Sequence, residues 1–126
     1  MQQEHKLPYL KIALYVFGII FIAGIGVMMW IFPAGWGWTP RQPEYEQMIM
    51  GIYATLGVFL IFAAKDPLSN SSLIWFTICS SFVHGGIMLV QAIVYEGERA
   101  HLLGDVPATL FVACVLWYLM HKKVRA

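Results

Sequence analysis

The stretch Thr77-Ile-Cys-Ser-Ser-Phe-Val-His-Gly-Gly-Ile-Met-Leu-Val-Gln91 decides how the chain is expected to fold. It places His84 inside a long apolar run, where an ionisable side chain is costly unless it faces protein. With helical spacing, one stripe carries most of the polar side chains and bulky apolar ones cover the other faces. The stripe consists of Thr77, Ser81, His84, Met88 and Gln91. We therefore expect a membrane-spanning helix whose stripe packs against protein.

The composition of the whole chain also indicates a membrane protein. Its 126 residues are 60% hydrophobic and 12% charged, with a mean hydropathy of +0.68, whereas charged residues make up about a quarter of a soluble domain. A net charge of +1 offers no basic surface for nucleic acid. Cys79 and Cys114 lie in apolar runs without a C-x-x-C spacing, which predicts small buried side chains and no disulfide or metal pair.

Four apolar segments are long enough to serve as spans of one domain, residues 1–126. The first, residues 12–32, would reach about 30 Å as a helix, which matches the hydrocarbon thickness. The others are expected at residues 47–64, 73–94 and 104–120. Pro67 stops the second segment, residues 69–72 offer an N-cap to the third, and Asp105 before Pro107 caps the fourth. The predicted fold is an all-α integral membrane four-helix bundle.

Positive charge predicts the orientation of the bundle. Placing both termini and the turn after the second span on one side leaves only Arg41 and Arg99 opposite. Because the positive side is cytoplasmic, both termini are predicted to be cytoplasmic. The charges gathered on that side are Lys6, Lys11, Lys65, Lys122, Lys123 and Arg125.

The outer loops carry aromatic and charged residues. Trp30, Trp36 and Trp38 follow the first span among prolines and glycines, which predicts an irregular loop in the headgroup layer. The fourth span is short, about 24 Å if it begins near Asp105. We therefore expect the outer loops to sink partway into the bundle.

His84 has three interpretations. As a neutral imidazole bonded to Ser80, Ser81 or Tyr53, it would hold helices together. As a proton-handling or quinone-contacting group, it would act with Tyr53 and Gln91. As an axial ligand, it would hold a haem or chlorophyll in the room left by the two glycines that follow it. The candidate cofactor-binding residues are His84, Tyr53, Gln91 and Ser81, and the candidate ligands are lipid, quinone and pigment.

A second candidate site lies in the outer layer, roughly 15 Å from His84 along the helix axis. Carboxylates and imidazoles are suitable ligands for zinc, iron or copper, so Glu46, His101 and Asp105 form a candidate metal set. The alternative is that Glu46 and Asp105 cap helices and form ion pairs. In that case His101 or Arg99 should lie within ion-pair or water-bridged reach of Glu46.

The sequence leaves two classes of function open. It contains no phosphate-binding loop, dinucleotide fingerprint or zinc-hydrolase motif, so an enzyme is the less favoured class. The first hypothesis is a non-catalytic accessory or structural subunit of a larger bacterial membrane complex. The alternative is a small membrane protein that binds a quinone or similar amphiphilic cofactor in an intramembrane pocket around His84.

Three segments carry a resemblance to known proteins: Tyr45-Glu-Gln-Met48, Ser72-Leu-Ile-Trp-Phe-Thr77 and His101-Leu-Leu-Gly-Asp-Val-Pro107. With them, the chain resembles a family of small bacterial four-helix membrane proteins classed as a domain of unknown function, from about residue 45 to 119. A more remote likeness, in architecture alone, is to the DoxX-like proteins. The family resemblance implies four helices and a bacterial inner-membrane location, and it supplies no activity.

Overall fold

The computed structural model describes residues 2–37 and 40–121, and these residues form an all-α fold. Apolar runs with few helix breakers explain why helices dominate. The elements in chain order are the helices α1 (Gln2–Ile19), the π-helical turn η1 (Ile20–Gly24), α2 (Ile25–Ile31), α3 (Pro33–Trp36), α4 (Pro43–Lys65), the 3₁₀ turn η2 (Leu68–Asn70), α5 (Ser71–Val94), the 3₁₀ segment η3 (Glu96–Leu103) and α6 (Asp105–His121).

Three helical stretches are long and apolar enough to cross a membrane. They are Leu7–Ile31, Pro43–Lys65 and Leu68–Val94. A fourth crossing results if η3 and α6, which meet at a bend of 43°, are taken as one broken span. Helices of this length and hydropathy indicate a membrane protein.

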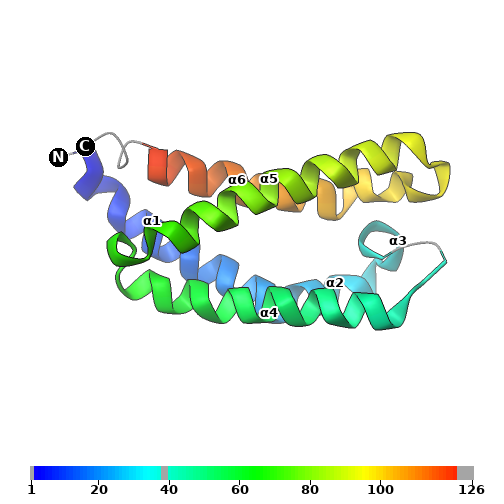
Figure 1. The fold of residues 1–126 in the computed structure, drawn as a ribbon, viewed down its shortest axis with the longest axis horizontal. Coiled ribbons are helices and arrows are strands. Elements are labelled where there is room, and N and C mark those ends of the chain that lie inside the picture. The colour runs from blue at the N-terminus through cyan, green and yellow to red at the C-terminus, as the bar shows by residue number, and fades with distance from the viewer. Residues whose placement is uncertain (1, 38–39, 122–126) are drawn as a thin grey trace.

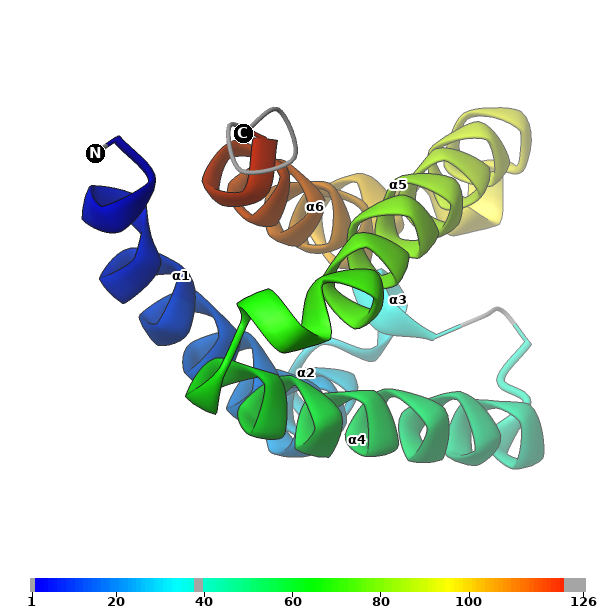
Figure 2. The ribbon, with the colours of Figure 1, turned by 60° about the vertical axis from the view of Figure 1, so that its left-hand side comes forward.

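The helices run back and forth between two ends of the molecule (Figure 1). The start of α1, the turn at η2 and the end of α6 lie at one end, which we call the inner end. The short elements α3 and η3 lie at the other, the outer end. α1, η1 and α2 follow one another as a continuous rod, of which α1 and η1 pack along α4, while α5 packs along α6. Figure 2 shows α4 and α5 diverging from their shared turn at η2.

Glycines permit two of the close helix crossings. A Cβ on Gly18 would lie 2.7 Å from the carbonyl oxygen of Gly57, so α1 and α4 touch through their backbones. A Cβ on Gly85 would lie 2.8 Å from the Leu110 side chain, where α5 meets α6. Such small-residue contacts are the usual means by which membrane helices approach each other.

The apolar core fills the inner half of the bundle. α1, α4, α5 and α6 all contribute buried side chains, which are Leu10, Leu14, Phe17, Phe21, Leu60, Ala63, Ala64, Ile74, Ile78, Val112, Leu116 and Met120. In the outer half, the buried side chains include charged ones: Glu46, Glu98, His101 and Asp105. The two halves of the molecule are therefore held together by different interactions.

Several local expectations need correction. The first helix begins at Gln2, ten residues before the expected first span, and contains Pro8; one proline costs the helix one backbone hydrogen bond and some strain. At the start of α5, Asn70 makes no side-chain cap. Instead Asp66 accepts a hydrogen bond from the Ser69 hydroxyl at 2.6 Å. Cys79 and Cys114 are free and exposed on helix surfaces, not buried.

Candidate functional site: an apolar cavity around His84

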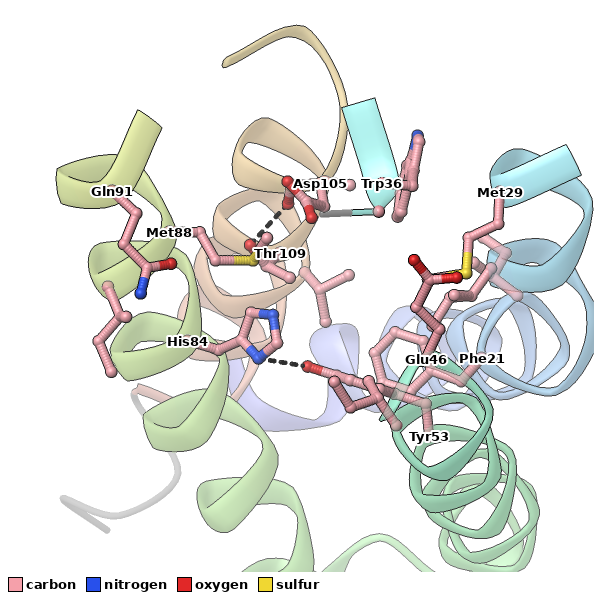
Figure 3. A pocket seen from close by; sticks show the side chains of 17 residues that line it. Phe21, Met29, Trp36, Glu46, Tyr53, His84, Met88, Gln91, Asp105 and Thr109 are labelled. Carbon is pink, nitrogen blue, oxygen red and sulfur yellow. Dashed lines mark hydrogen bonds between the residues drawn. The ribbon is translucent and has the colours of Figure 1, made fainter. Parts of the chain in front are cut away.

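A cavity of about 250 Å³ lies in the outer half of the bundle, with η1, α2 and α4 on one side and α5 and α6 on the other (Figure 3). Its wall is mostly apolar, with a few polar side chains. The apolar lining comes from Ile20, Phe21, Ile25, Met29, Trp36, Ile49, Ile87, Met88, Ala108 and Val112. The polar side chains in the wall are Glu46, Tyr53, His84, Gln91, Asp105 and Thr109. An apolar hollow with a few convergent polar groups is the usual form of a small-molecule site.

Tyr53 of α4 and His84 of α5 meet across this cavity. The Tyr53 hydroxyl lies 3.0 Å from Nδ1 of His84, a hydrogen bond that joins two helices. Phe21 packs edge-on against the Tyr53 ring, with centroids 5.2 Å apart, and so fixes its orientation. Figure 3 shows the other ring nitrogen of His84 turned toward the open space below Asp105. Among residues 2–37 and 40–121, His84 thus has Tyr53 as its hydrogen-bonding partner, and its other ring nitrogen faces the cavity.

The other two predicted cofactor-binding residues differ in position. Gln91 lies two turns further along α5 and lines the cavity, and Figure 3 shows its amide directed toward the same space as His84. Within the described residues its side chain takes part in none of the hydrogen bonds found. Ser81 is buried on the same face of α5, nearer the inner end, and is not among the lining residues. The cavity therefore brings together His84, Tyr53 and Gln91, with Ser81 behind them.

Glu46 closes the cavity toward the outer surface. Its carboxylate accepts two hydrogen bonds from the guanidinium of Arg41, at 2.8 Å from Nε and 2.7 Å from Nη2. This carboxylate raises the pKa of Arg41 above its ordinary value, because hydrogen bonding favours the charged form. Glu46 and Met29 also border a shallower outer hollow of about 400 Å³. The ion pair therefore stands between the cavity and the outer surface.

His101 is the centre of a buried polar cluster behind the cavity wall. Its Nδ1 lies 2.8 Å from Asp105, and its Nε2 lies 2.8 Å from Glu98 and 2.9 Å from the carbonyl oxygen of Gly37. All three partners are acceptors. The cluster therefore needs a hydrogen on both ring nitrogens, or a carboxyl group that keeps its own proton. The interaction joins η3, α6 and the end of α3.

The predicted metal set is only partly assembled. His101 and Asp105 are bonded to each other, and the carboxylate of Glu46 is held by Arg41. His101 and Glu46 both lie close to Gly37: His101 bonds its carbonyl oxygen, and a Cβ on Gly37 would lie 2.8 Å from Glu46 Oε1. No three His, Cys, Asp or Glu side chains within residues 2–37 and 40–121 are arranged to hold a metal ion. A metal here stays a prediction that this geometry does not favour.

The structure adds residues to the site that the sequence reasoning did not place there. Trp36 was assigned to the headgroup belt, but it lines the cavity, while Trp30 is exposed as expected; Trp38 lies outside the described residues. Thr109 was not singled out, yet it lines the cavity and donates its hydroxyl to the carbonyl oxygen of Asp105 at 2.7 Å. Glu98 completes the His101 cluster. Glu98 lies three residues before His101, and this spacing could have predicted their contact, because side chains three residues apart on a helix are neighbours.

Comparison with known proteins supplies the family. The model of a family of unknown function, DUF6632, matches residues 4–125. The chain belongs to this family. The predicted resemblance to a domain of unknown function is thereby confirmed, and it extends over the first span as well. No curated protein and no solved structure matches the chain, and no link to DoxX-like proteins is shown.

Proposed function

We propose that this protein binds a small amphiphilic molecule with a carbonyl-bearing head, a quinone or a similar lipid-soluble compound, in the cavity around His84. The observation that carries the proposal is the Tyr53–His84 hydrogen bond inside an otherwise apolar cavity. A polar pair in such a place is costly unless it has partners. A ligand head would provide the partner that the protein does not.

The chemistry of the pair favours an acceptor on the ligand. If the Tyr53 hydroxyl donates to Nδ1, then Nε2 of His84 keeps a hydrogen that faces the cavity. If Nδ1–H donates to Tyr53, the hydroxyl hydrogen is the one left over. In both tautomers the pair retains one spare donor, and the Gln91 amide provides two more. Ketone and quinone oxygens accept such hydrogen bonds, and their rings suit the aromatic wall formed by Phe21 and Trp36.

The same proposal includes a location. The excess of Lys and Arg at the inner end, against Arg41 and Arg99 at the outer end, supports a bacterial inner membrane orientation with both termini in the cytoplasm. The cavity would then lie in the outer leaflet half of the bundle. Cysteines introduced as Arg41→Cys and Lys65→Cys test this orientation in whole cells. Only the cysteine of Arg41→Cys should react with a membrane-impermeant maleimide.

The test of binding is chemical analysis of the protein purified from native membranes. We expect an extracted quinone or similar compound in a fixed ratio to the protein, and its loss in His84→Leu. The matched control is Val83→Leu, because Val83 neighbours His84 on α5 but faces outward. Ligand-free wild-type protein that also fails to bind added quinone would refute the proposal. A coloured extract with a Soret band would instead identify a haem or chlorophyll.

A second candidate function is an accessory subunit of a larger membrane complex. It is favoured by one face of α4: a Cβ on Gly51 would meet nothing within 4 Å, and Thr55, one turn on, is exposed. Small residues at this spacing let another helix approach. Sizing after mild solubilisation should then show a large particle, which Gly51→Leu would break up. A monomer in several mild detergents argues against this function.

A further inference from the structure

The cavity is closed at its outer end. The Arg41–Glu46 ion pair and the His101 contact to Gly37 lie across that end. In addition, a Cβ on Gly104 would overlap the backbone of Gly35, so α3 and the junction of η3 with α6 are in backbone contact. A ligand that came from the aqueous side would have to break the half-exposed Arg41–Glu46 pair and the buried hydrogen bond between His101 and Gly37, which leaves buried polar groups without partners.

The cavity is also closed toward the inner end and toward α6. The apolar core fills the inner half of the bundle. On the side where α1 meets α6, Phe17 and Phe111 pack edge-on, with ring centroids 6.2 Å apart. Ile20, one turn above Phe17, lines the cavity and is 43% exposed, but the α6 residues in the wall, Ala108, Thr109 and Val112, are not exposed. This side therefore has an exposed lining residue on one helix only.

The side between α4 and α5 is different. Ile49 of α4 and Ile87 of α5 both line the cavity, yet they are 40% and 53% exposed. Exposed lining residues on both neighbouring helices, and not on one alone, mark an opening between them. The two helices diverge here because each packs on another partner, α4 on α1 and α5 on α6 (Figure 2). The surface beside this opening is apolar, with exposed Ile52, Val83 and Val90.

The size of the cavity limits what it can enclose. Pockets that bury a whole drug-sized ligand measure about 300–1,000 Å³, and this one measures about 250 Å³. It has room for a single substituted ring, but not for a ring together with a long hydrocarbon chain. Such a chain would have to leave through the opening between Ile49 and Ile87, where it would meet apolar side chains and lipid.

We infer that the ligand is a long-tailed lipid, with its ring bound by Tyr53, His84 and Gln91 and its tail passing sideways between Ile49 and Ile87 into the bilayer. This inference rests on the proposed function and specifies the ligand class and its route. The opening forms a lateral portal through which the ligand exchanges with the membrane. The outer polar contacts stay closed throughout.

The test uses two probes with the same ring, dimethoxy-methyl-benzoquinone without a tail and decylubiquinone with a decyl tail. Binding to the full chain in nanodiscs is followed by quenching of tryptophan fluorescence. The wild-type protein should bind the tailed probe more tightly than the tail-free probe. Ile49→Phe with Ile87→Phe, which narrows the portal, should raise the Kd of the tailed probe about tenfold or more and change that of the tail-free probe less than about twofold. Ile20→Phe, on the opposite wall, should not raise the Kd of the tailed probe relative to that of the tail-free probe. The control is Val27→Phe, an exposed residue of α2 outside the cavity wall, which should alter neither Kd.

Each outcome separates the portal from the site. If Ile20→Phe weakens the tailed probe and the portal variant does not, the tail leaves on the α6 side and the inference is wrong. Equal losses for both probes in the portal variant would mean that the substitutions distort the cavity, and they would also overturn it. If both probes bind in a way that depends on His84, and neither wall variant changes their binding, the proposed function stands and the portal is wrong. If neither probe binds, both the proposed function and the portal are wrong.

Discussion

The two described histidines that lie within the bundle have opposite surroundings. His101 has acceptors at both ring nitrogens, from Glu98, Asp105 and Gly37. His84 has one protein partner, Tyr53, and borders a cavity. A fully bonded buried cluster holds elements in place, whereas a polar group with spare hydrogen-bonding capacity beside a cavity is suited to a ligand. The difference assigns a structural role to the outer cluster and a binding role to the His84 pair.

The largest effect is expected from His101→Ala. Removing the imidazole would leave two buried carboxylates and the Gly37 carbonyl without this partner, and loss of one member of a buried charge pair costs about 3–5 kcal/mol. Thermal and denaturant unfolding in mild detergent, followed by circular dichroism, measures the change. His121→Ala is the control, because His121 contacts the Trp117 ring on the helix surface and should change stability little. If the His101→Ala protein is as stable as its parent, the structural role assigned to the His101 cluster is wrong.

An intermediate effect is expected from Gly104→Ala. The added methyl group would overlap the backbone of Gly35, so α3 must move away from η3, and overpacking of this kind costs about 1–3 kcal/mol. Gly97→Ala is a matched control, since a Cβ there meets nothing within 4 Å. The same unfolding assay applies to both. Equal stability of the two variants would mean that the α3 contact contributes little to holding the outer end together.

The smallest effect on stability is expected from Tyr53→Phe. It removes one hydrogen bond between membrane helices, worth about 0.6 kcal/mol on average and at most about 1.7. Its effect on quinone binding should be larger than its effect on stability, because the spare donor of the pair is lost or reoriented. Tyr45→Phe on the exposed face of α4 is the control. If Tyr53→Phe destabilises the protein as strongly as His101→Ala, the His84 pair is also structural.

Much of the fold follows from local patterns. The apolar runs predicted the bounds of α4, α5 and α6 to within a few residues, although the first helix begins ten residues before the expected first span. Pro67 and Asp105 marked boundaries that the structure retains. The prediction that the polar stripe on α5 faces protein was also correct. Thr77 and Ser81 are buried, while Phe82, Ile87 and Val90 are exposed. These features depend on helix geometry and hydropathy, which act over a few turns.

The partners of the charged residues did not follow from the sequence. Glu46 was expected within ion-pair or water-bridged reach of His101 or Arg99. Its ion pair with Arg41, five residues earlier in a loop, was not foreseen, whereas Glu46 and His101 do both lie against Gly37. Trp36 was expected at the membrane surface, and it lines the cavity because α3 folds back against η3. Loop conformation decides these contacts, and spacing rules for helices do not describe it.

By itself, the sequence determined that the chain forms long apolar helices, that His84 lies on a protein-facing stripe, and that charged residues gather at the helix ends. Only the tertiary structure decided that Tyr53, His84 and Gln91 share one cavity with Glu46 and Asp105, which spacing along the helices had placed in a separate layer. The physical reason is helix packing. α4 packs on α1 and α5 packs on α6, so the two pairs leave a space between them that no single helix encodes.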